Sequence, residues 1–271
     1  MSLSGRTALV TGGGSGIGAA LTRALVRDGV HVVCADLDLA AATLVAGSVS
    51  GPGSAVAREV DVTSAEAVAA AVEAVVAEHG RIDLVFNNAG ITFLGNTEEL
   101  TLTQWNAIID VNVRGVVHGV HAAYPRMIAQ GSGHLVNTAS MGGLMAAGLM
   151  TSYVATKHAV VGLSLALRTE AAAHGVGVTV VCPAAVDTPI LDKGEIGRFR
   201  GRDFYLEGQG VKHPVDADVR ARRILRAVEA DEAIVVEPRQ ARIAWRMGRL
   251  SPTLVNRLAT RFIAKQRAQA S

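Results

Sequence analysis

Aromatic side chains and cysteines are scarce in this chain of 271 residues. Phe, Trp and Tyr make up only 4% of it, so its hydrophobic 49% must build a core mainly from alanine and branched aliphatic residues. The two cysteines, Cys34 and Cys182, each end a short apolar run, which is typical of small buried side chains. The sequence therefore argues against a disulfide-stabilised fold, and we expect a reducing, cytoplasmic setting and no metal site.

A long hydrophobic run is also missing. The longest stretch without Asp, Glu, Lys or Arg, 127–156, is interrupted by polar side chains and five glycines. A membrane-spanning helix needs about 20 predominantly apolar residues, so we reject a transmembrane segment. The N-terminus leads directly into a predicted strand and a glycine-rich turn, so we expect no secretory signal.

Acidic residues are absent from the end of the chain. Residues 238–271 hold eight of the 26 basic residues and no Asp or Glu, which leaves 18 basic against 24 acidic residues in the rest. Because the body is acidic and lacks a recognised nucleic-acid-binding module, we do not expect nucleic-acid binding. We predict a catalytic domain over 1–237 and a basic helical extension over 238–271.

The basic extension contains a second recognisable pattern. Ser251-Pro252 resembles a helix start, and an apolar row and a basic row follow at helical spacing: Leu254, Leu258 and Phe262, then Arg257, Arg261 and Lys265. Three roles stay open, namely packing on this or a neighbouring subunit, peripheral contact with a membrane surface, and contact with an acidic protein.

Short β-branched runs alternate with alanine-rich segments along the body. The pattern predicts strands at 7–10, 31–35, 55–60, 82–86, 134–137, 176–182 and 233–236. It predicts helices at 17–28, 39–46, 65–79, 102–126, 153–173 and 216–230. Such alternation is typical of parallel strands joined by helical crossovers. We therefore predict an α/β fold with a Rossmann-like, doubly wound parallel sheet of about seven strands and helices on both faces.

The first predicted turn has the features of a dinucleotide site. Glycines in the run Gly12-Gly13-Gly14-Ser15-Gly16-Ile17-Gly18 allow the backbone to approach a pyrophosphate, and the following helix offers free N–H groups to it. Asp36, eighteen residues beyond Gly18, stands where a carboxylate binds the adenosine ribose and repels a 2′-phosphate. We therefore predict NAD over NADP. Asp61 and Val62 follow the third strand, where they either contact the adenine or belong to a helix cap region.

Tyr153 and Lys157 are four residues apart on a predicted helix, with Ser140 thirteen residues upstream of Tyr153. This spacing places the phenol and the ammonium on one helix face. A nearby cation favours the phenolate, so we expect Lys157 to lower the pKa of Tyr153. The tyrosine would then exchange a proton with an alcohol or a ketone near neutral pH.

These motifs, with Asn87-Asn88-Ala89-Gly90, Asn112 and Pro183…Thr188, resemble the short-chain dehydrogenase/reductase family over residues 5 to 237. The resemblance implies a nicotinamide-dependent oxidoreductase with the four catalytic residues Asn112, Ser140, Tyr153 and Lys157. Tyr153 would be the general acid/base, Ser140 would bind the substrate oxygen, and Asn112 would support Lys157 through a water chain. The implied cofactor contacts are Gly12, Ser15, Gly16, Ile17, Gly18, Asp36, Asp61, Val62, Asn88, Gly90, Tyr153, Lys157, Pro183 and Thr188.

Two further features concern the substrate side. The family commonly has glycine where this chain has Ala184, and a positive φ at that position would strain alanine. We expect a substrate lid at about 189–214, and an apolar substrate pocket is predicted from the residues after Ser140: Met141, Leu144, Met145, Leu149 and Met150. The lid segment also carries basic residues that could orient an anionic substrate.

The leading hypothesis is an NAD-dependent dehydrogenase that interconverts a hydrophobic secondary alcohol and its ketone or aldehyde. A second hypothesis is a 3-oxoacyl-carrier or CoA reductase, whose acidic carrier the basic extension would bind. A remote third is a cofactor-binding regulator without catalysis, against which the intact catalytic set argues. The family resemblance also implies a homo-oligomer, a tetramer or a dimer.

Overall fold

The computed structural model describes residues 3–199, 201–209 and 211–269. Three parts of the sequence-based predictions lie outside these ranges, namely the first two residues of the predicted catalytic domain, Arg200 and Gly210 of the expected lid, and the last two residues of the basic extension. The described strands are β1 (Thr7–Thr11), β2 (His31–Asp36), β3 (Ser54–Glu59), β4 (Leu84–Asn87), β5 (Gly133–Thr138), β6 (Val176–Pro183) and β7 (Ile234–Glu237).

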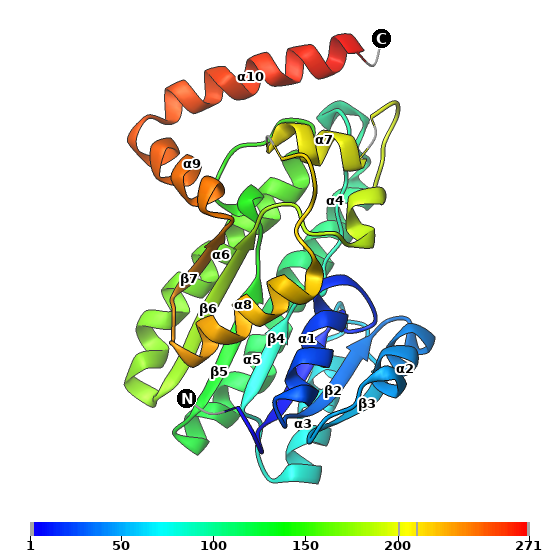
Figure 1. Cartoon of the computed structure of the whole chain (residues 1–271), viewed down its shortest axis with the longest axis vertical. Helices are drawn as coiled ribbons and strands as arrows, with labels where there is room; N and C mark the ends of the chain where they lie inside the picture. Colours follow the sequence, from blue (N-terminus) through cyan, green and yellow to red (C-terminus); the bar gives the residue numbers. More distant parts are fainter. Residues whose placement is uncertain (1–2, 200, 210, 270–271) are drawn as a thin grey trace.

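These strands form one sheet in the order β3-β2-β1-β4-β5-β6-β7, and every pair is parallel (Figure 1). The strand order reverses between β1 and β4, the two strands that pair at the centre of the sheet. In a sheet of this kind, ligands bind outside the carboxyl ends of the strands near the reversal. The predicted α/β fold with a doubly wound sheet is confirmed.

Helices cover both faces of the sheet. The described α-helices are α1 (Gly16–Arg27), α2 (Leu39–Ser48), α3 (Ala65–His79), α4 (Leu102–Ile109), α5 (Gly115–Gln130), α6 (Thr151–Ala171), α7 (Gly201–Gly208), α8 (Ala217–Glu229), α9 (Arg239–Leu250) and α10 (Pro252–Gln269). Short 3₁₀ turns are η1 (Thr97–Glu99), η3 (Met141–Gly143), η4 (Ala172–His174) and η5 (Pro189–Asp192), and η2 (Asp110–Arg114) is π-helical.

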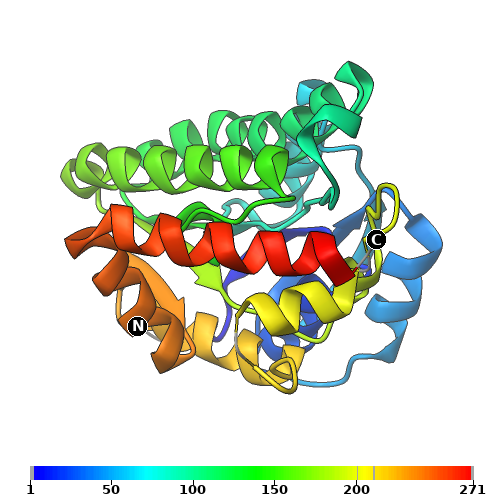
Figure 2. The ribbon, with the colours of Figure 1, turned by 90° about the horizontal axis from the view of Figure 1, so that it is seen from above.

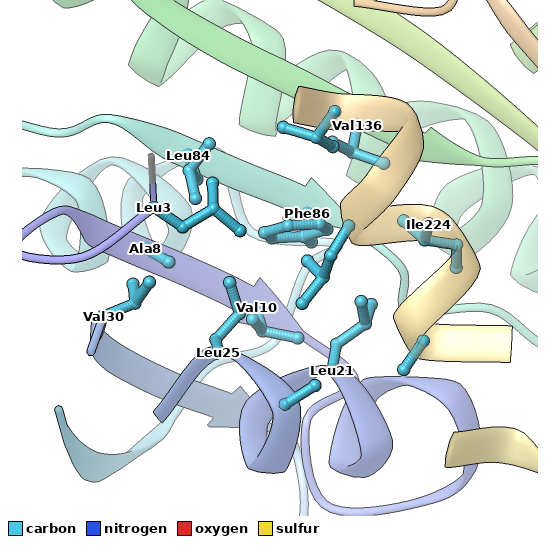
Figure 3. Packing of buried hydrophobic residues seen from close by; sticks show 14 of the residues in the cluster. Leu3, Ala8, Val10, Leu21, Leu25, Val30, Leu84, Phe86, Val136 and Ile224 are labelled. Atoms are coloured by element: carbon cyan, nitrogen blue, oxygen red, sulfur yellow. The ribbon is translucent and has the colours of Figure 1, made fainter. Parts of the chain in front are cut away.

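The core consists of two apolar layers, one on each face of the sheet. Figure 3 shows the first, where Leu21 and Leu25 of α1 and Ile224 of α8 pack on Val10 and Phe86 of the central strands. The second layer lies under α3, α5 and α6 and is built almost entirely from Ala, Val and Leu. Burial on both faces explains why the strands read as continuous apolar runs in the sequence.

The predicted helix over 102–126 is not continuous. It is divided into α4 and α5 by the π-helical turn η2, which contains Asn112, and α5 continues to Gln130. A π turn inserts one extra residue into an α-helix and so redirects the side chains in it. Helical periodicity cannot reveal such a local insertion. Two further helices, α7 within the lid segment and α9 after β7, were not expected as separate elements.

The last two helices lie at the carboxyl end of the sheet (Figures 1 and 2). α9 packs beside β7, and α10 runs across the end of the molecule next to α7. Among the described residues, no helix combines the length and apolar character needed to span a membrane.

Candidate active site

A cavity of about 530 Å³ opens at the carboxyl edge of the sheet, where β1, β2, β4, β5 and β6 end. Ligand pockets are typically about 300–1,000 Å³ in volume. The predicted site residues that line the cavity are Gly12, Ser15, Gly16, Ile17, Asp36, Asp61, Val62, Asn88, Gly90, Ser140, Tyr153, Lys157, Pro183 and Thr188. Gly18 and Asn112 do not line it and lie behind its wall.

The glycine turn is built by close backbone packing. Gly12 has a φ of +63°, and a Cβ there would lie 2.9 Å from the Ala89 Cα atom. A Cβ at Gly18 would lie 2.0 Å from the Gly12 carbonyl oxygen, so α1 packs directly on the turn. Gly18 therefore acts by positioning the turn rather than by lining the cavity.

The N-terminus of α1 has the chemistry of an anion site. Its first turn carries no acidic side chain, and its N-cap, Ser15, makes no side-chain cap hydrogen bond with the described backbone. The first N–H groups and the positive end of the helix dipole thus remain available toward the cavity. Thr188 packs against the turn, because a Cβ at Gly16 would lie 2.9 Å from its Cγ2 atom. These features fit the pyrophosphate of a dinucleotide.

Asp36 joins the glycine turn to the end of β2. Its Oδ2 atom accepts a hydrogen bond of 2.9 Å from the Gly14 N–H, and its Oδ1 atom accepts one of 3.0 Å from the Asp38 N–H. The carboxylate therefore holds the turn in place as well as lining the cavity. The neighbouring Leu37 side chain also lines the cavity and is 67% exposed. Asp61 lines the cavity too, and its Oδ1 atom accepts from the backbone N–H and the hydroxyl of Thr63, next to the N-cap of α3. The adenine contact of this segment stays a prediction.

Asn88, which follows β4, forms hydrogen bonds with the ends of β1 and β5. Its Nδ2 donates to the carbonyl oxygen of Thr11 at 3.2 Å, and its Oδ1 accepts from the Thr138 hydroxyl at 3.2 Å. The backbone N–H of Asn88 donates to the Thr11 hydroxyl at 3.0 Å. The segment after β4 is thus fixed against β1 and β5, which shapes the floor of the cavity.

Tyr153 and Lys157 lie one turn apart on α6, and Ser140 reaches the same region from the end of β5. The Lys157 Nζ atom lies 5.7 Å from the centre of the Tyr153 ring and donates a 2.8 Å hydrogen bond to the Thr138 carbonyl oxygen. The Ser140 Oγ atom accepts from the Gly142 N–H at 3.1 Å. An acid/base candidate, a cation and a hydroxyl therefore share one wall of the cavity.

The pKa of Tyr153 is shifted in the direction opposite to the sequence-based expectation. Burial raises this pKa, while a hydrogen bond with Ser140 partly opposes the rise. Burial also lowers the pKa of Lys157 to about 8, since desolvation disfavours its charged form. Tyr153 is therefore protonated at neutral pH, which suits it to donate a proton to a carbonyl oxygen. The expected lowering of the Tyr153 pKa by Lys157 is therefore wrong, because desolvation is the largest contribution and Lys157 is not among the groups that shift this pKa.

Asn112 is fully buried in the π turn η2, behind the cavity wall. Its Nδ2 donates to the Ile91 carbonyl oxygen at 2.9 Å and to the Thr156 hydroxyl at 3.1 Å, and its Oδ1 accepts from the Ile91 N–H at 2.9 Å. These bonds join the segment after β4 to α6. The Cβ position of Gly90 lies 3.2 Å from Asn112 Oδ1 and 3.4 Å from Lys157 Nζ, so this glycine leaves room between the two groups.

We expect a Gly90→Ala variant to lower kcat, because its methyl group would enter the space between Asn112 and Lys157. Small displacements of catalytic groups can reduce the rate by about a hundredfold. The control is Gly162→Ala on the exposed side of α6, where a Cβ meets nothing within 4 Å. Steady-state rates and thermal unfolding should be measured for both. A kcat for Gly90→Ala equal to that of the parent protein would contradict the expectation.

Ala184 lies at the end of β6 and does not have the positive φ that would strain an alanine. Among described non-glycine residues, positive φ values occur at Leu149 and Asp231, not at Ala184. The Ala184 N–H donates a 2.9 Å hydrogen bond to the Glu237 carbonyl oxygen, so the backbone here continues the pairing with β7. Pro183 and Ala184 both line the cavity.

The apolar residues after Ser140 do not form the predicted substrate pocket. Met141 is buried in a cluster with Val160 and Val161, and Leu149 and Met150 are buried under the lid with Phe199. The cavity wall is instead formed on this side by two groups of residues. Ile190, Leu191, Lys193, Tyr205 and Gln209 belong to the expected lid segment, whereas Ile91, Thr92, Ala185 and Val186 were not singled out from the sequence. Met141 and Met150 therefore belong to the hydrophobic core and do not line the cavity.

Tyr205 is a functional candidate that the sequence placed in the expected lid without giving it a role in the site. It belongs to α7 in the lid, lines the cavity, and shares a 2.8 Å hydrogen bond with the Thr92 hydroxyl. Burial raises its pKa, and Tyr153 contributes in the same direction, which places the two phenols in one electrostatic environment. The signal available in the sequence was a tyrosine within the predicted lid.

Comparison with known proteins supports these observations. The family model described as short chain dehydrogenase matches residues 6–196. A cyclohexanol dehydrogenase from Acinetobacter sp. (strain SE19) is 39% identical over 192 residues, which cover 70% of this chain and 76% of the relative.

Two solved structures extend the comparison. A short chain dehydrogenase/reductase from Burkholderia phymatum in complex with NAD superposes with a TM-score of 0.84 at 28% identity and covers 94% of this chain and 96% of that chain. A 3-ketoacyl-(acyl-carrier-protein) reductase from Brucella melitensis complexed with NADH gives a TM-score of 0.77 at 30% identity, with coverages of 86% and 97%. From its sheet, its cavity and these matches together, the chain belongs to the short chain dehydrogenase family of oxidoreductases.

Proposed function

We propose that this protein is an NAD-dependent dehydrogenase that interconverts a hydrophobic secondary alcohol and its ketone or aldehyde. The proposal rests on one observation: Ser140, Tyr153 and Lys157 line the same cavity as the glycine turn and Asp36. In such enzymes the nicotinamide, when bound, accepts or delivers the hydride, and the protein supplies position and electrostatics.

The residues that would hold this cofactor follow from the site. The N-terminus of α1 and the glycine turn would hold the pyrophosphate, and Asp36 would accept hydrogen bonds from the adenosine ribose. A carboxylate at that position repels a 2′-phosphate, which supports NAD over NADP. Lys157 stands at the opposite end of the cavity, where it can donate to further hydroxyl groups.

The chain's own residues would carry the proton. The Tyr153 hydroxyl donates its proton to the carbonyl oxygen during reduction, which leaves a phenolate; during oxidation the phenolate form accepts the proton of the alcohol. Ser140 lines the cavity together with Tyr153, so its hydroxyl can stabilise charge on the substrate oxygen. Lys157 provides a positive charge below its pKa of about 8. Asn112 holds α6 and the segment after β4 in register.

The cavity wall supports an apolar substrate with a small polar part. Ile91, Val186, Ile190 and Leu191 supply apolar surface, and the Tyr205–Thr92 pair supplies two hydroxyl groups. The similarity to a cyclohexanol dehydrogenase is consistent with such a substrate.

The 3-oxoacyl reductase alternative is supported by the similarity to a solved reductase of that type. One observation weighs against it. Lys265 and Arg267 of the basic extension already bind Glu207 and Asn96 within the chain, which leaves them less available to an acidic carrier. Asp36 does not separate the two hypotheses, because the solved reductase of this type is itself complexed with NADH.

A substrate panel tests the proposal directly. We expect NAD-dependent oxidation of cyclohexanol and of longer acyclic secondary alcohols, with kcat/KM rising with apolar surface, followed by the absorbance of the reduced cofactor. A polyol and, in the reverse direction, a 3-oxoacyl thioester serve as the comparison substrates. Preferential reduction of the thioester would favour the reductase alternative, and no turnover of any substrate would favour a regulator without catalysis.

A further inference from the structure

The two C-terminal helices each bury one face against the rest of the chain. Trp245 of α9 packs on the cluster under α6, and Phe262 and Ile263 of α10 pack on the lid cluster that contains Phe204. Polar contacts add to this, since Gln266 Nε2 donates to Glu207 at 2.7 Å and Arg267 to Asn96 at 2.8 Å. Figure 2 shows α10 lying along α7. The extension is therefore a docked element with a defined inner and outer side.

The outer side carries five large apolar side chains around the corner between α9 and α10. In α9, three of them follow helical spacing and are half or more exposed: Ile243 (50%), Met247 (56%) and Leu250 (87%). In α10, Leu254 is 50% exposed and Leu258 is 54% exposed. Phe262, one turn further, turns inward to the lid, so the predicted apolar row of α10 is divided between two environments.

Positive charge surrounds these apolar side chains. Arg246, Arg257 and Arg261 are exposed and make no hydrogen bond or ion pair with any described residue. Each lies three or four helical residues from an exposed leucine and so beside it: Arg246 before Leu250, Arg257 after Leu254 and Arg261 after Leu258. The sequence after Glu237 contains no acidic residue that could neutralise them.

We propose that this outer side of α9 and α10, named here the basic hairpin face, binds an anionic lipid surface. Exposed leucine and methionine side chains can enter the boundary between headgroups and acyl chains while arginines bind lipid phosphates. This requires a helix that lies on the membrane, which agrees with the finding that no described helix can span one. The proposal does not depend on which reaction the enzyme catalyses.

Charge favours this partner over a second copy of the chain. A two-fold symmetric contact would bring the arginines of two subunits into one interface, and like charges at an interface are unfavourable. An anionic membrane instead offers phosphates to every arginine of the face. Because α10 contacts α7, whose Tyr205 lines the cavity, the membrane surface would lie close to the substrate lid.

Vesicle co-sedimentation of the full chain tests the proposal. We expect binding to vesicles of phosphatidylcholine with phosphatidylglycerol and much weaker binding to phosphatidylcholine alone. A Met247→Glu/Leu250→Glu variant should lose binding. An Arg246→Gln/Arg257→Gln/Arg261→Gln variant should lose about fivefold in partition for each arginine, since each cation near an anionic surface contributes about 1 kcal/mol. Truncation is a poorer test, because removal of α10 uncovers Phe204.

Matched substitutions elsewhere on the surface control for general effects of charge. Leu44→Glu/Leu102→Glu alters two leucines that are 75% and 80% exposed, and Arg27→Gln/Arg222→Gln/Arg226→Gln removes three exposed arginines. Both controls should bind vesicles like the parent protein, and thermal unfolding should show that all variants fold. Equal binding to both vesicle types, no binding to either, or unchanged binding of Met247→Glu/Leu250→Glu overturns the proposal. Dissociation of an oligomer by that variant, seen by light scattering, would assign the face to a second copy instead.

Discussion

Replacing Tyr153 by phenylalanine should lower kcat by about a hundredfold to ten-thousandfold, the usual contribution of a positioned general acid or base. The variant removes the hydroxyl that exchanges the proton but keeps the ring, which lies 5.7 Å from Lys157 Nζ and packs against the lid cluster. Cofactor affinity and thermal stability should therefore change little. Steady-state kinetics, together with a fluorescence titration of NADH, separates the two effects.

Tyr124→Phe provides the matched control for this substitution. Tyr124 lies on α5, outside the cavity lining, where its ring contacts His174. We expect its kinetics to match those of the parent protein. If Tyr153→Phe retained most of the parent kcat, the assignment of Tyr153 as the proton donor would be wrong. A loss of NADH binding in the same variant would indicate a structural role for the hydroxyl.

The double variant Asp36→Asn/Leu37→Arg should shift the cofactor preference from NAD toward NADP. Asparagine keeps an oxygen that can accept the Gly14 N–H, so the glycine turn stays in place, whereas Asp36→Ala would also remove that support. The arginine at position 37 would give a 2′-phosphate a cationic partner from a side chain that already lines the cavity. Losing or gaining a hydrogen bond to a charged group changes binding by about 1.5–3 kcal/mol, or roughly tenfold to more than a hundredfold.

The ratio of kcat/KM for NAD to that for NADP measures this shift. Asp38→Asn is the control, because Asp38 also lines the cavity but serves as the N-cap of α2, where its Oδ1 accepts the Ala41 N–H at 3.0 Å. We expect the control to keep the parent preference. A parent protein that already prefers NADP, or a ratio that the double variant leaves unchanged, would refute the role assigned to Asp36.

Most of the sheet and the outline of the site could be predicted because their signals are local. The glycine turn, Asp36 and the Tyr153–Lys157 pair each depend on residues close in sequence, and parallel strands bring their carboxyl ends to one edge. The structure places fourteen predicted site residues in one cavity lining for this reason. Gly18 and Asn112 lie behind the wall, where they support the turn and α6.

Other features depend on contacts between distant segments and so could not be predicted. Asn87, Asn137 and Ser164 form a buried hydrogen-bonded chain across β4, β5 and α6, although only Asn87 belongs to a motif recognised in the sequence. Tyr205 meets Thr92 from a segment more than a hundred residues away. The π turn at Asn112 likewise breaks a pattern that reads as one helix.

The sequence by itself determined the alternation of strands and helices, the dinucleotide turn and the spacing of the proton-transfer pair, because these follow from periodicity and from neighbours along the chain. Only the tertiary structure decided which apolar residues line the cavity, which side of the C-terminal helices remains exposed, and the direction of the Tyr153 pKa shift. The burial of a side chain depends on many segments that are distant in the sequence and come together only in the folded chain. Desolvation of the buried phenol therefore sets the direction of the Tyr153 shift, and the nearby lysine does not reverse it.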